Sequence, residues 1–222
     1  MITRLLIIVN VLAFVWEVFA SGGGMLSLMG GNTQGVANVL EAGALWPAAA
    51  LVDHQWWRIL TSAFLHGGLL HIGVNMISLW YLGRFIEAAA GPVRMTVIYF
   101  ASLIASGLGV VYLSPAANAL VPTLGASGAI FGLFGALFAI GFKLGKPGMQ
   151  LIRANLGILI LNLVITFTVP QIAWEAHVAG LAAGFLLTLL IYVPPRRVAP
   201  VVVDAHTGNR YETEYQTPEP PR

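Results

Sequence analysis

Four polar side chains stand in otherwise apolar sequence and are of the types that acyl transfer uses. Ser127 lies among small and aliphatic residues in GASGAIFG (125–132), and His177 lies in a similar run. His71 and Asn75 are four residues apart, which places them on one face of a helix. A serine nucleophile needs a base within hydrogen-bonding distance and donors for the oxyanion that develops on the substrate. The pattern therefore predicts Ser127 as nucleophile and His177 as base. The other two side chains and the serine backbone N–H would hold the oxyanion.

Each of these residues also has a simpler explanation. A serine in an apolar helix commonly bonds to the carbonyl one turn earlier, and a single histidine is more often structural than catalytic. His71 and Asn75 equally suit hydrogen bonding between packed helices. The hydrolytic interpretation therefore depends on whether the fold brings all four side chains to one place.

Composition indicates a membrane protein and defines the elements that must position these residues. Hydrophobic residues make up 58% of the 222 residues and charged residues only 9%, which is more apolar surface than a soluble domain of this size buries. A helix needs about 20 apolar residues to cross the hydrocarbon. Six such stretches run over 2–20, 69–87, 93–113, 124–142, 151–169 and 175–193. The expected fold is an all-α membrane protein, a six-transmembrane-helix bundle formed by residues 1–193.

The two ends of the sequence differ from the central spans. Residues 194–222 are polar and proline-rich, and we expect a disordered cytosolic tail there. The first stretch has an alternative, a cleaved signal peptide, because Arg4 precedes its apolar run. Its length, together with Asn10 and Glu17, favours a helix that packs against polar neighbours. The chain has no cysteine, which excludes disulfides and thiol chemistry.

The basic residues predict the orientation of the spans. Lysine and arginine concentrate in cytoplasmic loops. Those that fall together on one side are Arg4, Arg84, Arg94, Lys143, Lys146, Arg153, Arg196 and Arg197. Both ends of the six-helix domain are therefore expected in the cytoplasm, with Arg58 on the outer side. The second, fourth and sixth spans then begin on the outer side, so the four polar side chains share one depth. The net charge of +2 reflects this orientation and does not indicate nucleic-acid binding.

Small residues recur every four positions in the fourth and sixth spans and predict close contact between the two helices. They are Gly128, Gly132 and Ala136 in the fourth span and Ala176, Gly180 and Gly184 in the sixth. Close approach is a condition for a direct hydrogen bond between Ser127 and His177. Glu175 is two residues from His177 and points to a different helical face, so the pattern predicts a Ser–His dyad. Phe131, one turn after Ser127, is the expected packing partner that holds the imidazole.

These residues and their flanks resemble the rhomboid family of intramembrane serine proteases. The resemblance spans about residues 40–190 and rests on WWRILTSAFLHGGLLHIGVNM (56–76), YLGRFIE (81–87), GASG (125–128) and AHVAGLAAG (176–184). It implies a compact six-helix bundle with its active site in a water-filled cavity below the outer membrane surface. It also implies substrates that are single-pass transmembrane helices in the lipid bilayer, cut near the membrane edge without a cofactor or metal.

The resemblance also assigns roles to individual residues. The residues of the site are Ser127 and His177 as the catalytic pair, His71 and Asn75 as oxyanion donors, and Gly125, Gly128 and Phe131 in support. Many family members have tyrosine in place of Phe131. The residues with structural roles are Trp57, Arg58, Glu87, Gly180 and Gly184. The expected location is a bacterial inner (plasma) membrane, as a multi-pass protein.

Two other functions would use parts of the same pattern. A metal-dependent intramembrane protease would use His66, His71 and His177, but the H-E-x-x-H pattern is missing and the first two are five residues apart. A catalytically silent membrane chaperone or quality-control factor would use the same fold to bind transmembrane segments without cutting them. Cleavage by the purified protein separates this second alternative from the protease.

Overall fold

The structure is a computed structural model of the chain, and it describes residues 1–22, 24–31, 34–170, 172–194, 201–203 and 210–212. The elements in these residues are α1 (Ile2–Ala20), α2 (Met25–Leu28), α3 (Gln34–Gly43), α4 (Pro47–Leu51), α5 (Arg58–Thr61), η1 (Ser62–Phe64), α6 (Leu69–Ala90), α7 (Pro92–Leu113), η2 (Ala116–Asn118), α8 (Ser127–Leu144), α9 (Lys146–Thr168), α10 (Trp174–Ile191), β1 (Val201–Val203) and β2 (Arg210–Glu212).

Six helices of the described chain are long and apolar enough to cross a membrane, namely α1, α6, α7, α8, α9 and α10. They confirm the predicted all-α bundle of six spans. Several boundaries differ from the prediction, most of all the start of α9, which was expected at residue 151 and lies at Lys146. Helix α6 continues to Ala90, where Gly91 at φ 88° separates it from α7. Helix α8 begins only at Ser127, because Gly125 adopts φ 112°, which no helix contains.

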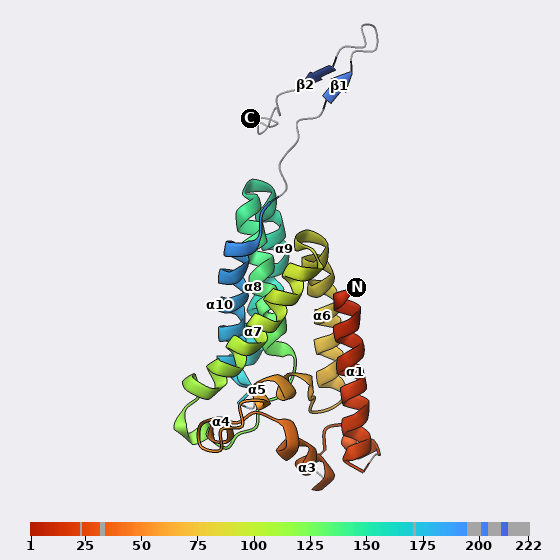
Figure 1. Ribbon diagram of the computed structural model, residues 1–222, viewed down its shortest axis with the longest axis vertical. Coiled ribbons are helices and arrows are strands. Elements are labelled where there is room, and N and C mark those ends of the chain that lie inside the picture. Colours follow the sequence, from red (N-terminus) through yellow and green to blue (C-terminus); the bar gives the residue numbers. More distant parts are fainter. Residues whose placement is uncertain (23, 32–33, 171, 195–200, 204–209, 213–222) are drawn as a thin grey trace. The chain divides into compact units, whose positions relative to one another are not determined.

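Helix α8 is the centre of the bundle. In its membrane-spanning window 78% of the residues are buried, against 17% in α9. Aliphatic side chains of α8 and of two neighbouring helices are fully buried there, among them Leu137 of α8, Leu79 of α6 and Ile98 of α7. Figure 1 shows α10 beside α8 and α1 beside α6, with α7 crossing the view. Helix α9 is therefore the span that the rest of the bundle covers least.

Glycines allow α8 and α10 to touch backbone to backbone. A Cβ atom at Gly180 would collide with the carbonyl oxygen of Gly128, and one at Gly184 with that of Gly132. Without side chains in between, the two helices lie at the closest separation that van der Waals contact permits. This contact brings the first turn of α8 against the first turn of α10.

The segment that leads into α8 is anchored by backbone hydrogen bonds. Thr123 and Leu45 exchange two of them, with N···O distances of 2.7 and 3.0 Å, and the Gly125 N–H donates to the Ser62 carbonyl at 2.9 Å. These bonds tie residues 123–125 to the α3–α4 connection and to η1. The start of α8 is thereby fixed in position.

Arg58 organises the connection between α1 and α6. Its guanidinium is buried and donates to the Ala44 carbonyl at 2.8 Å and to the Gln55 side chain at 2.5 Å. It also stacks on two tryptophans, with its Cζ 4.8 Å from the Trp46 ring centroid and 5.7 Å from that of Trp57. These hydrogen bonds, together with cation–π contacts to two aromatic rings, account for a buried arginine here.

Polar side chains also cap helix ends at the end of the bundle away from Arg58. The Glu87 carboxylate accepts from the backbone N–H groups of Ile2 and Thr3 at 2.8 and 3.1 Å, and from the Thr3 hydroxyl at 2.8 Å. The Lys143 ammonium donates to the Leu189 and Tyr192 carbonyls, both at 2.6 Å. Such caps satisfy backbone groups that helix ends leave unpaired.

Residues Val193–Arg222 form a separate unit from Met1–Tyr192. Its described strands β1 and β2 pair antiparallel, with Val202 opposite Tyr211. The expectation of a disordered tail over 194–222 falls mostly on residues outside the described ranges, and there it stays a prediction.

Candidate active site

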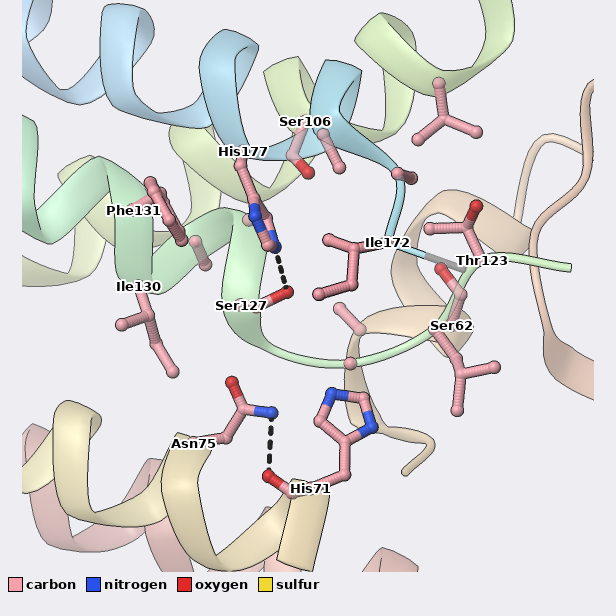
Figure 2. A pocket seen from close by; sticks show the side chains of 18 of the residues that line it. Ser62, His71, Asn75, Ser106, Thr123, Ser127, Ile130, Phe131, Ile172 and His177 are labelled. Carbon is pink, nitrogen blue, oxygen red and sulfur yellow. Dashed lines mark hydrogen bonds between the residues drawn. The ribbon is translucent and has the colours of Figure 1, made fainter. Parts of the chain in front are cut away.

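Ser127 and His177 form a direct hydrogen bond across the α8–α10 contact. Ser127 is the first residue of α8 and His177 is the fourth residue of α10. The His177 Nε2 atom lies 2.8 Å from the Ser127 Oγ atom. Figure 2 marks this hydrogen bond with a dashed line. The first N–H groups of a helix have no intrahelical acceptor, so the backbone around Ser127 presents free donors beside its hydroxyl.

Phe131 stacks on the imidazole of His177. The two ring centroids are 4.1 Å apart and the planes differ by 11°. Both side chains are buried, and Phe131 lies one turn after Ser127 on α8. The phenyl ring therefore covers one face of the imidazole. The Nε2 edge of the imidazole remains in contact with Ser127.

The second ring nitrogen of His177 has a partner that the sequence analysis missed. The Thr166 hydroxyl on α9 lies 2.7 Å from His177 Nδ1, and it is also 2.7 Å from the Asn162 carbonyl oxygen. The imidazole is thus held by a hydrogen bond as well as by packing, which corrects the expectation that packing alone holds it. One signal was available: the last turn of the fifth predicted span lies at the same depth as the first turns of the fourth and sixth.

Glu175 is close to His177 in sequence and is not hydrogen-bonded to it. The side chain is 1% exposed, and its Oε1 atom has no hydrogen-bond partner among the described residues. It lines a small cavity of about 130 Å³ beside Thr166. The residue that contacts the imidazole nitrogen is therefore a threonine from a different helix.

His71 and Asn75 lie one turn apart on α6 and face the same cavity as Ser127 (Figure 2). The Gly67 N–H donates to His71 Nδ1 at 3.2 Å, which makes Nδ1 an acceptor and leaves the proton on Nε2. The Asn75 amide donates one hydrogen to the His71 carbonyl at 3.1 Å and keeps its second hydrogen. Each side chain therefore has one N–H available.

Gly125 allows the His71 ring to approach the start of α8. A Cβ atom at Gly125 would lie 2.8 Å from both Nε2 and Cε1 of that ring, closer than real Cβ contacts come. The residue also adopts φ 112°, where side chains are strained. Glycine here meets both a conformational and a steric requirement.

The four side chains line one cavity of about 620 Å³. Its wall includes residues of α6, α7, α8, α9 and α10, and of the segments that precede α6 and α8. Gly128, next to the serine, packs against Ser106 of α7, where any side chain would collide. Thr166 borders this cavity and the smaller one. The fold thus brings together Ser127, His177 and the His71–Asn75 pair, which come from three helices.

The histidines of the metal-dependent alternative have other partners. His66 is buried and its ring packs edge-on against that of His71, with centroids 5.2 Å apart. The His66 Nδ1 atom lies 3.2 Å from the Phe64 carbonyl, and both ring nitrogens of His177 are engaged as described. In the described part of the chain, no three His, Cys, Asp or Glu side chains gather as a metal site would require.

Comparison with known proteins finds relatives that belong to one family. A sequence model of the Rhomboid domain matches residues 53–194. The chain is 33% identical over 171 residues to the rhomboid protease GluP of Bacillus subtilis, which covers 77% of this chain and 32% of that protein. It is 34% identical over 141 residues to the putative rhomboid protease YdcA of the same organism, covering 63% and 69%.

A third relative is named differently. The chain is 34% identical over 184 residues to the inactive RHOMBOID-like protein 8 of Arabidopsis thaliana, which covers 80% of this chain and 50% of that protein. The chain thus spans about a third of GluP and half of the Arabidopsis protein. With six membrane-spanning helices and a domain match over residues 53–194, the chain belongs to the rhomboid family.

Proposed function

We propose that this protein is an intramembrane serine endopeptidase that cleaves transmembrane segments of single-pass proteins through a Ser127–His177 dyad. The observation that carries the proposal is the 2.8 Å contact between Ser127 Oγ and His177 Nε2 inside a cavity of about 620 Å³. A serine hydroxyl is a weak nucleophile, and a hydrogen-bonded imidazole activates it by accepting its proton.

The reaction proceeds in two steps, acylation of Ser127 and hydrolysis of the acyl-enzyme. Ser127 Oγ attacks the carbonyl carbon of the substrate, its proton moves to His177 Nε2, and the carbonyl π electrons move onto the oxygen. The tetrahedral intermediate collapses, the C–N bond breaks, and the imidazolium gives its proton to the leaving amine. A water molecule then attacks the acyl ester with the same base, which releases the acid and restores Ser127.

The oxyanion needs donors that are in place before charge develops. The His71 Nε2–H, the second hydrogen of the Asn75 amide and the free N–H at the start of α8 supply three. All are on the wall of the cavity that holds Ser127. Gly67 supports this role because its N–H fixes the His71 tautomer that donates from Nε2.

The cavity and the charges suggest the substrate and the orientation. The cavity wall is mostly apolar, with Leu70 and Val74 on α6 and Ile165 on α9, which suits an apolar peptide segment. The basic residues favour cytoplasmic ends for the six-helix domain in a bacterial inner membrane. Cleavage would then occur toward the outer side.

A catalytically silent family member that binds transmembrane segments is the second candidate, because a matched relative is named inactive. The experiment uses the purified full chain in lipid vesicles with a panel of tagged single-pass substrates. Wild-type protein should generate two fragments, and Ser127→Ala should bind the same substrates without cutting them. Co-purification of intact substrate with both proteins, without fragments, would favour the silent candidate.

A further inference from the structure

We infer that Thr166 is a positioning residue that fixes the tautomer of the base His177. The inference rests on the proposed serine-protease function and assigns a third residue to its dyad. Thr166 lies on α9, whereas Ser127 and His177 lie on α8 and α10. The geometry that supports the inference is a chain of three short contacts that ends at the serine hydroxyl.

The hydrogen-bond directions along this chain follow from the Thr166 hydroxyl. It has one proton and two neighbours that can accept it, the Asn162 carbonyl oxygen and His177 Nδ1, each at 2.7 Å. A carbonyl oxygen can only accept. If the proton went to Nδ1, two oxygens would face each other at 2.7 Å with no hydrogen between them. The hydroxyl therefore donates to Asn162 and accepts from an Nδ1–H of His177.

This assignment determines what His177 offers to Ser127. With its proton on Nδ1, the neutral imidazole has a lone pair on Nε2, the atom 2.8 Å from Ser127 Oγ. The other tautomer would present an N–H to the serine and could not accept its proton. After proton transfer, the imidazolium keeps its Nδ1–H bond to Thr166. The threonine oxygen thus serves both the neutral base and its protonated form.

Burial makes this contact consequential. Thr166 is 3% exposed and His177 is 8% exposed, so solvent has little access to either group. A buried Nδ1–H that loses its acceptor incurs a desolvation penalty. That penalty favours the tautomer with the proton on Nε2, which cannot accept the serine proton. Because Thr166 lies on α9 and His177 on α10, the placement of α9 beside α10 determines whether the acceptor is present.

The test compares three variants of the full chain in vesicles. Thr166→Val keeps the branched shape and removes the hydroxyl, Thr166→Ser keeps the hydroxyl, and Thr168→Val removes an exposed hydroxyl on the same helix that bonds only within α9. Thr166→Val should lower kcat about 10- to 100-fold with KM within about twofold, and Thr166→Ser should stay within about threefold of wild type. Thr168→Val should leave kcat unchanged.

A spectroscopic measurement separates this inference from the proposed function. The ¹⁵N shifts of the His177 ring report which nitrogen carries the proton and need no turnover. Wild-type protein and Thr166→Ser should show the Nδ1–H form, and Thr166→Val should show more Nε2–H form. An Nε2–H form in wild type, or an unchanged kcat in Thr166→Val, would overturn the inference. Cleavage that survives Ser127→Ala would instead overturn the proposed function, whatever the tautomer.

Discussion

Ser127 Oγ and His177 Nε2 lie 2.8 Å apart, although 50 residues and a complete membrane span separate them in the chain. Gly180 and Gly184 account for this proximity, because side chains at these positions would collide with the α8 backbone and push α8 and α10 apart. Helix packing and catalytic geometry are therefore one structural feature.

Gly184 tests this link between packing and the site. A Cβ atom at this position would collide with the Gly132 backbone, which cannot move as a side chain end can. Gly184→Ala should lower the free energy of unfolding by about 1–3 kcal/mol and reduce cleavage. The matched control is Gly157→Ala on α9, where no atom lies within 4 Å of the added Cβ atom. Equal melting temperatures for the two variants would show that the α8–α10 contact tolerates a side chain.

Asn75 tests the oxyanion site. Removing one preorganised donor typically lowers the rate about 10²- to 10³-fold, so Asn75→Ala should cleave slowly and still bind substrate. Asn38→Ala, which removes an exposed amide on α3, serves as the control and should retain wild-type kcat. Wild-type turnover by Asn75→Ala would assign this side chain to its helix bond with His71 alone.

Phe131 tests the stacking contact. Phe131→Leu should lower kcat about 3- to 10-fold, because the aromatic face on the imidazole is lost, and Phe131→Tyr should be tolerated. Phe134→Leu is the control, since that ring packs against Phe131 and makes no ring contact with His177 among the described residues. Glu175→Gln should have little effect on cleavage. If Glu175→Gln abolished cleavage while Phe131→Leu remained active, the carboxylate would be the group that orients the base.

His66 gives a pH dependence of stability. Burial and the neighbouring His71 lower the pKa of His66 from its ordinary 6.5 to about 4. The unfolded chain therefore takes up this proton at a higher pH than the folded protein does. The free energy of unfolding should therefore fall progressively as the pH drops from about 6.5 toward 4, by up to about 3 kcal/mol. Unfolding measured against pH should show a smaller acid loss in His66→Gln. An identical loss in that variant would assign it to other groups.

The sequence was sufficient for the six spans and for the pairing of Ser127 with His177. The four-residue repeats of small residues predicted the α8–α10 contact that joins the two, and the orientation inferred from charge placement stays a prediction. The predicted C-terminal end of α6 and the predicted start of α8 were less accurate. Gly91 ends α6 and Gly125 delays the start of α8 through positive φ angles, which hydropathy does not register.

Thr166 and Gly67 make contacts that the sequence does not specify, because shared depth alone does not single out a residue. Asn155, Asn162 and Thr166 recur at helical spacing on one face of α9, but nothing in the sequence places that face against His177. A threonine four residues after Asn162 is also ordinary in a transmembrane helix, where it bonds back to that carbonyl. The Gly67 contact comes from a backbone N–H, which every residue except proline has. Both contacts depend on tertiary packing.

The most direct test of the central claim is covalent labelling of Ser127 by a fluorophosphonate, located by peptide mass mapping. The probe reacts with activated serines and needs no knowledge of the natural substrate. Wild-type protein should carry one label, on the peptide that contains Ser127. His177→Ala should label far more slowly, and Ser127→Ala should not label there. No labelling of wild-type protein, or labelling at full rate in His177→Ala, would contradict an activated Ser127–His177 dyad.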